Sequence, residues 1–104
     1  MHIAVAQSPG ELNGIEERIN WAEKKLNSIQ NKKIDLIVFP ELFTCGYNSG
    51  SYIKKSAEDK SGGSFSIFSK LAKYYKIGIH YGYAEKKGSK IYNSSQFIGS
   101  NGLS

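Results

Sequence analysis

Residues 36–39 read Leu-Ile-Val-Phe, and this continuous apolar run constrains the fold of the chain more than any other feature. Its length is typical of a central strand that is buried on both faces of a sheet. Pro40 ends the run because proline has no backbone N–H to donate to a neighbouring strand. The remaining segments must therefore supply the strands that flank this one and the layers that cover it.

The other apolar residues are spaced as in strands and helices that alternate along the chain. Residues 14–33 and 65–75 each place their apolar side chains on a single stripe of a helix. Residues 77–84 alternate large apolar side chains with Gly, His and Ala, and a Lys-Lys-Gly-Ser turn joins them to residues 90–98, which predicts a hairpin. The predicted elements are strand 2–7, helix 14–33, strand 35–39, helix 65–75, strand 77–84 and strand 90–98. This β-α-β-α-β-β order predicts an α/β fold with a mostly parallel sheet and a C-terminal hairpin.

The predicted layers leave one face of the sheet without a cover. Each helix carries a single apolar stripe, so both are expected on the same face, while the strand at 36–39 is apolar on both sides. The Ser-Asn-Gly turn at residues 100–102 also indicates a further strand. We therefore expect a chain truncated at its C-terminus, whose open face is covered by a second copy or by the rest of a longer protein. Alone, it should expose a large apolar patch and associate.

The charge of the chain limits the classes of function. The formal net charge is +5 and the sequence pI is about 9.3, which taken alone favours an acidic partner such as nucleic acid. However, Arg18 is the only arginine, and the lysines are spread along the chain beside acidic residues. A solvated lysine-rich surface is the favoured interpretation, and no nucleic-acid partner is expected.

The sequence carries no pattern that indicates a membrane, secretion or a metal centre. No apolar run approaches the roughly 20 residues that span a bilayer, and the first residues lack the pattern of a signal peptide. The single cysteine, Cys45, cannot form an internal disulfide. No His, Cys or Asp cluster has metal-ligand spacing, and Gly62-Gly63 lacks the phosphate-loop pattern. The default expectation is a cytoplasmic protein with no membrane partner, metal or other cofactor.

Glu41 is the candidate catalytic residue. It directly follows Pro40 at the carboxyl end of the predicted central strand, and ligands of open α/β sheets bind beyond that edge. Proline restricts the backbone beside it, so the carboxylate has a stiff support at the mouth of a pocket. A Pro-Glu pair alone favours an ordinary surface acid, so the choice depends on the surrounding residues.

The residues around Glu41 resemble a known motif. Residues 39–43 read Phe-Pro-Glu-Leu-Phe and residues 46–48 read Gly-Tyr-Asn, and this pattern is similar to the glutamate motif of the nitrilase superfamily of carbon–nitrogen hydrolases. The similarity extends over essentially the whole chain. It also includes the segments 3–7 (Ile-Ala-Val-Ala-Gln), 35–38 (Asp-Leu-Ile-Val), 62–75, 81–85 (Tyr-Gly-Tyr-Ala-Glu) and 91–94 (Ile-Tyr-Asn-Ser).

The resemblance implies an amidase-like enzyme with a Glu-Lys-Cys triad in an αββα sandwich. Glu41 would then be the general base. Tyr47 is a candidate to line the substrate pocket because its loop leads away from Glu41, although packing of its ring against the sheet explains it equally well. Residues 1–104 would be the amino-terminal part of a single hydrolase domain, that is, an incomplete αββα sandwich. The complete protein would hydrolyse a nonpeptide carbon–nitrogen bond in a small-molecule amide, nitrile or carbamoyl compound, without a cofactor, and would form a homo-oligomer.

The chain has no match to the lysine and cysteine of the triad. Lys86, Lys87 and Lys90 belong to the predicted hairpin turn. Cys45 lies in the same loop as Glu41, where the resemblance places a small residue, so it is interpreted as a buried loop residue and not as the nucleophile. The chain alone is therefore expected to be inactive.

Other interpretations of the sequence remain open. His80 lies alone in mid-strand, which favours a structural role, and Asn93 is expected to hydrogen-bond the backbone or the loop of Glu41. Tyr81 and Tyr83 follow the alternation of their strand, which favours core packing over a base-stacking platform. The alternative functions are a non-catalytic truncated subunit that binds a partner, and a small basic α/β module that binds polyanions.

Overall fold

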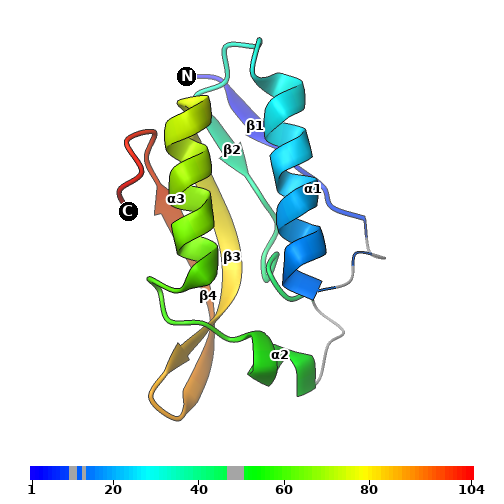
Figure 1. Ribbon diagram of the computed structural model, residues 1–104, viewed down its shortest axis with the longest axis vertical. Coiled ribbons are helices and arrows are strands. Elements are labelled where there is room, and N and C mark those ends of the chain that lie inside the picture. The colour runs from blue at the N-terminus through cyan, green and yellow to red at the C-terminus, as the bar shows by residue number, and fades with distance from the viewer. Residues whose placement is uncertain (10–11, 13, 47–50) are drawn as a thin grey trace.

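The computed structural model describes residues 1–9, 12, 14–46 and 51–104. Its elements follow the order β-α-β-α-α-β-β (Figure 1). They are β1 (Ile3–Val5), α1 (Gly14–Ile29), β2 (Leu36–Val38), α2 (Ser51–Ser56), α3 (Gly63–Tyr75), β3 (Gly78–Lys87) and β4 (Lys90–Ile98). Strands and helices alternate along most of this order, which confirms the predicted α/β class.

The strands form a four-stranded sheet in the order β1-β2-β3-β4. β1 and β2 pair in parallel with Ile3 opposite Leu36, and β2 and β3 pair in parallel with Leu36 opposite Gly78. β4 returns antiparallel to β3 through the turn between Lys87 and Lys90. The sheet is therefore mostly parallel with a C-terminal hairpin, as the sequence predicts.

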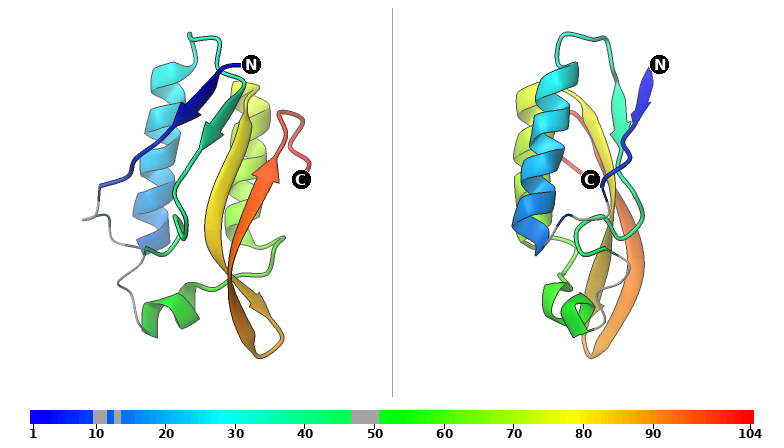
Figure 2. Two further views of the ribbon diagram at one scale, coloured as in Figure 1. Left: turned by 180° about the vertical axis from the view of Figure 1, so that it is seen from behind. Right: turned by 90° about the vertical axis from the view of Figure 1, so that its right-hand side faces the viewer.

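α1 and α3 lie side by side on one face of this sheet (Figure 2). Their apolar stripes pack against the strand side chains that point toward them, and this packing removes apolar surface from water. The core formed in this way includes Ala22, Leu26, Ile37, Phe39, Phe43, Phe68, Ala72, Ile79, Tyr81 and Ile98. We call this side of the sheet the covered face.

Local contacts stabilise the ends of the helices. Glu16 and Glu17 occupy the first turn of α1, where the helix dipole favours negative charge. Gly62 precedes α3 without a capping side chain, and Glu58 Oε1 instead accepts a hydrogen bond from the backbone N–H of Ser64 at 2.8 Å. Lys76 ends α3 in a left-handed conformation with φ of 56°, which is common for the residue after a helix.

The opposite side of the sheet carries neither of these helices (Figure 2). Val5 exposes 74% of its surface there, and Phe97 exposes 50%. We call this surface the open face, and it is formed by Ile3, Val5, Leu36, Val38, His80 and Phe97. An apolar face without a cover is what the sequence predicts, and the association of the chain through it stays a prediction.

Two features differ from the sequence prediction. α2 lies between the predicted strand 35–39 and the predicted helix 65–75, where the sequence predicts no element, because a helix of six residues is too short to show a helical period. α1 ends at Ile29 and not near residue 33, since the chain turns there and Ile29 O accepts a hydrogen bond from Lys32 N at 2.9 Å. Among the described residues, no helix is long and apolar enough to cross a membrane.

Candidate active site

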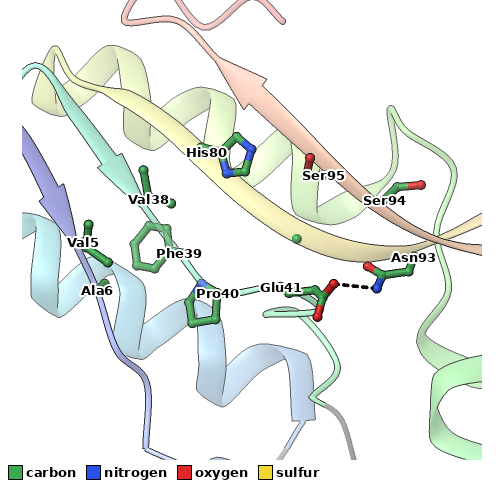
Figure 3. A pocket seen from close by; sticks show the side chains of 11 residues that line it. Val5, Ala6, Val38, Phe39, Pro40, Glu41, His80, Asn93, Ser94 and Ser95 are labelled. Atoms are coloured by element: carbon green, nitrogen blue, oxygen red, sulfur yellow. Dashed lines mark hydrogen bonds between the residues drawn. The ribbon is translucent and has the colours of Figure 1, made fainter.

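Glu41 lies at the carboxyl end of β2, at the edge where the carboxyl ends of parallel strands meet. Phe39 N–H donates to His80 O at 2.8 Å, so pairing with β3 continues past the end of β2. Pro40 then leads the chain to Glu41, whose side chain reaches into a pocket (Figure 3). The structure therefore places Glu41 at the expected edge, and its catalytic role stays a prediction.

The backbone of Glu41 rests directly on Gly82 of β3. Gly82 N–H donates to Pro40 O at 3.2 Å, and Gly82 O accepts a hydrogen bond from Thr44 N at 3.3 Å. A Cβ atom on residue 82 would lie 2.5 Å from Leu42 N and 2.7 Å from the Cα of Glu41. Because real Cβ atoms do not approach so closely, this contact requires glycine at position 82.

A tight turn follows Glu41. Leu42 has a left-handed φ of 48°, which is uncommon for a residue other than glycine. Its carbonyl oxygen accepts hydrogen bonds from Cys45 N at 3.1 Å and Gly46 N at 2.7 Å. Gly46 itself has φ of 82°, a conformation that glycine adopts without steric cost. These contacts hold the segment after Glu41 in one shape.

Arg18 joins this turn to α1 and is almost fully buried. Its Nη1 donates to Phe43 O at 3.1 Å and its Nη2 donates to Leu12 O at 3.0 Å. A Cβ atom on residue 46 would lie 2.7 Å from Nη2, so Gly46 also makes room for the guanidinium group. The sequence does not predict that Arg18 links α1 to this turn. Arginine is seldom buried unless it is paired, so an exposed position would be expected from the sequence.

The pocket beside Glu41 lies on the open face and has a volume of about 470 Å³. Its walls differ in chemistry (Figure 3): Val5 and Val38 line one side, residues 93–95 line the other, and His80 lies between them on β3. Asn93 Nδ2 donates a hydrogen bond to Glu41 Oε2 at 2.9 Å, in agreement with the predicted hydrogen bonding of Asn93 to the loop of Glu41. This volume falls in the range of sites that bind small molecules.

Cys45 is unsuited to act as the nucleophile of this pocket. It exposes only 4% of its surface, and it is not among the residues that line the pocket. Burial raises the pKa of its thiol, an effect that the charge of Arg18 opposes only in part. Since the thiolate is the reactive form, a raised pKa disfavours attack. The prediction that Cys45 is a buried loop residue is confirmed.

The remaining candidate residues fall into two groups. Tyr47 lies outside the described residues. Lys86, Lys87 and Lys90 are exposed on the hairpin, and they do not line the pocket. Within the described part of the chain, no group of three or more His, Cys, Asp and Glu side chains is arranged to hold a metal ion.

The fold and the site together define a class of protein: an α/β sheet with helices on one face and a carboxylate-lined pocket at the carboxyl edge of its parallel strands. The family model for carbon-nitrogen hydrolases matches residues 2–103, and the chain belongs to that family. This match confirms the resemblance to the nitrilase superfamily.

Two relatives in sequence have similar descriptions. The chain is 42% identical over 76 residues to a probable nitrilase of Schizosaccharomyces pombe, which covers 69% of this chain and 28% of that protein. It is 28% identical over 107 residues to a Staphylococcus aureus protein named as a hydrolase in the agr operon, which covers 98% of this chain and 39% of that protein. The chain therefore spans well under half the length of these two relatives.

Solved structures of amidases share the fold. An N-terminal amidase with a Gln-Gly peptide superposes with a TM-score of 0.83 at 23% identity, covering 97% of this chain and 25% of that chain. An amidase from Nesterenkonia sp. superposes with a TM-score of 0.84 at 15% identity, covering 99% of this chain and 40% of that chain. A double mutant of the latter enzyme, with one Glu-to-Gln and one Cys-to-Ala change, was solved in complex with acrylamide. At these identities the likeness shows a shared nitrilase-like fold.

Proposed function

We propose that the complete protein hydrolyses a nonpeptide carbon–nitrogen bond, with an amide as the favoured substrate and Glu41 as the general base. Membership of the carbon-nitrogen hydrolase family supports this type of reaction. Residues 1–104 would form the amino-terminal part of one hydrolase domain, which agrees with the 28% and 39% of its two relatives that the chain spans. In the complete protein, further chain or a second copy would then cover the open face.

The position of the Glu41 carboxylate is the main observation that supports its proposed role as the general base. A general base must be held within hydrogen-bond reach of the proton that it takes. The backbone of Glu41 is fixed between Pro40 and Gly82, and its Oε2 accepts a hydrogen bond from Asn93 at 2.9 Å. The same side chain borders a pocket of about 470 Å³. A carboxylate with this support can meet a small substrate in one defined orientation.

The reaction also needs a thiol and an amine, which the family resemblance assigns to a cysteine and a lysine that have no counterpart in this chain. Glu41 would take the proton of the thiol while sulfur forms a bond to the amide carbon. The lysine would stabilise the negative charge on oxygen. Glu41 would then give the proton that it took to the substrate nitrogen, which leaves as ammonia or an amine as the carbon–nitrogen bond breaks.

Glu41 would act a second time in the release of the acid. The first half of the reaction leaves the acyl group on sulfur as a thioester. Glu41 then takes a proton from water while the water oxygen adds to the thioester carbon. The carbon–sulfur bond breaks, the thiol regains its proton, and the carboxylic acid departs. One carboxylate therefore serves both halves, which explains why a rigid support for Glu41 matters.

Small amides are the favoured substrates among the compounds that this family hydrolyses. An amidase with the same fold was solved with acrylamide, and the pocket beside Glu41 has the size of a small-molecule site. Nitriles and carbamoyl compounds are the other candidates. We propose that the complete protein acts on them without a cofactor and as a homo-oligomer.

Ammonia release by the complete gene product tests the proposal. Acrylamide and pentanamide serve as probes, and the Glu41→Gln variant should lose roughly a hundredfold or more of kcat, since it keeps the shape of the side chain but cannot take a proton. Glu17→Gln is the matched control, because Glu17 is exposed on α1 and lies outside the pocket. Full activity of Glu41→Gln, or equal losses in both variants, would reject Glu41 as the base.

A further inference from the structure

Asn93 lies on β4 and meets the Glu41 carboxylate across the sheet. It stands opposite Ala84 of β3, and Ala84 follows Gly82 by one step on the same side of that strand. The backbone of Glu41 rests on Gly82, so the Glu41 side chain starts one strand step from the pair of Ala84 and Asn93. Asn93 Nδ2 lies 2.9 Å from Glu41 Oε2 (Figure 3). Glu41 is therefore held at its backbone by β3 and at its carboxylate by β4.

The hairpin fixes the position of the Asn93 amide. β3 and β4 pair from Ile79 opposite Ile98 to Lys87 opposite Lys90, and Asn93 lies within this ladder and not at its end. Strand pairing therefore sets its backbone position, and the short side chain carries Nδ2 only two bonds beyond Cβ. An ionised carboxylate only accepts hydrogen bonds, and the NH₂ group of asparagine donates them, so the two groups match chemically.

The stability of β4 does not explain an asparagine at position 93. Asparagine is depleted in β-strands, where β-branched and aromatic side chains pack better. Asn93 is also exposed, so its side chain buries little apolar surface. Its hydrogen bond instead reaches the candidate base. A residue that suits its strand poorly but contacts a functional group is expected at functional sites.

Ser95 is the other polar residue on this side of β4. It stands opposite Gly82 and lines the same pocket. Within the described part of the chain, however, the hydrogen bond that β4 gives to the Glu41 carboxylate comes from Asn93 and not from Ser95. The geometry therefore assigns the support of the carboxylate to Asn93, and Ser95 provides a comparison on the same strand.

We infer that Asn93 is a positioning residue, which holds Oε2 of Glu41 so that the carboxylate meets the thiol and later the water in one orientation. The inference rests on the proposed function, because it takes Glu41 as the base. The hydrogen bond joins two residues of this chain, so the inference requires no access to the pocket from the open face. Loss of this bond should slow the chemical steps more than it weakens substrate binding.

Kinetics of the complete gene product test this role, with acrylamide or pentanamide as the probe, whichever wild type hydrolyses faster. Asn93→Leu removes the donor at similar size, and Asn93→Gln keeps a donating amide on a side chain one methylene longer. Asn27→Leu is the matched control, because Asn27 is exposed on α1, lies outside the pocket and also takes part in a 2.9 Å side-chain hydrogen bond, with Gln30. Ser95→Ala tests the neighbouring hydroxyl group.

Asn93→Leu should lower kcat roughly ten- to a hundredfold, the usual effect of losing one hydrogen bond to a charged group, and should change KM by about threefold or less. Asn93→Gln should recover part of this loss, and Ser95→Ala should lower kcat less than Asn93→Leu does. Asn27→Leu should match wild type. A wild-type kcat in Asn93→Leu overturns the inference, and so does a loss that appears in KM alone. Equal losses of kcat in Asn93→Leu and either Asn93→Gln or Ser95→Ala also overturn it.

The same experiment separates this inference from the proposed function. If wild type releases ammonia from neither amide, or if Glu41→Gln releases it as fast as wild type, the proposed function fails and the inference fails with it. If Glu41→Gln loses turnover while Asn93→Leu keeps it, only the role of Asn93 is rejected. Thermal unfolding of Asn93→Leu should match that of wild type because the side chain is exposed, and a large loss of stability would indicate a structural role and overturn the inference.

Discussion

The covered face and the open face of the sheet are built from the same strands, but they serve different purposes. On β3, Ile79 and Tyr81 are buried beneath the helices. The alternate residues of the same strand, His80 and Gly82, meet the pocket and the backbone of Glu41. Alternation along one strand thus separates the side chains that stabilise the chain from those that form the site. Substitutions on the two faces should therefore have separable effects.

Phe68→Ala is expected to have the largest effect on stability. Phe68 is fully buried on the covered face, with its ring 4.5 Å from that of Tyr81 and 6.0 Å from that of Phe39. Removal of such a ring costs about 3–5 kcal/mol of unfolding free energy. Phe97→Ala on the open face is the control, and it should cost about 1 kcal/mol or less because the ring is half exposed. Urea denaturation followed by circular dichroism measures both, and equal losses would contradict the division between the faces.

Gly82→Ala is expected to have the second largest effect on stability. It tests the close contact between Gly82 of β3 and the backbone of Glu41. The added methyl group would collide with Leu42 N and the Cα of Glu41, and relief of that overlap should cost about 1–3 kcal/mol. In the complete protein kcat should fall as well, since Glu41 is displaced. Gly63→Ala is the control, because its methyl group would lie at an ordinary 3.5 Å from Glu58 Oε1. An active, stable Gly82→Ala variant would show that the support of Glu41 is not rigid.

Much of the fold follows from local periodicity, which a sequence displays directly. The alternation from Ile77 to Tyr83 predicted which side chains of β3 enter the core, and the structure buries Tyr81 and Tyr83 as expected. α3 follows its apolar stripe closely and ends beside the predicted Lys76. The sequence does not predict α2, because six residues cannot reveal a period. It predicts too late an end for α1, because the polar residues near that end carry no clear stop signal.

The candidate site was less accessible to sequence reasoning, because its contacts join residues far apart in the chain. The place of Glu41 could be predicted, since it depends on the end of its own strand and on Pro40. The contacts of Gly82 with Glu41 and of Arg18 with Phe43 depend on how separate elements pack. A single glycine or arginine forms no periodic pattern in the sequence from which such contacts could be predicted. Only the packing of the separate elements determines which residues Gly82 and Arg18 contact.

High pH should weaken the covered face. Burial raises the pKa of Tyr81 and of Tyr83 above the ordinary value of 10.0, and for Tyr83 the charge of Glu85 adds to the effect. The unfolded chain therefore loses these protons near pH 10 while the folded chain keeps them, so stability falls as pH rises above about 10. Urea denaturation between about pH 8 and 11 should show a constant unfolding free energy followed by a decline. Tyr83→Phe should make the decline shallower, and an identical decline would argue against this cause.

Val5→Lys is expected to have the smallest effect on folding, but it tests the open face most directly. Val5 exposes 74% of its surface, so the change in unfolding free energy should stay within about 0.5 kcal/mol. A lysine amid exposed apolar side chains should nevertheless reduce association of the isolated chain, since apolar patches drive such contacts. Tyr74→Lys is the matched control, because Tyr74 is 77% exposed on α3, away from the open face. Sedimentation velocity over a range of concentrations should show less association for Val5→Lys only. A wild-type chain that stays monomeric throughout, or equal reductions in both variants, would mean that the open face does not drive association.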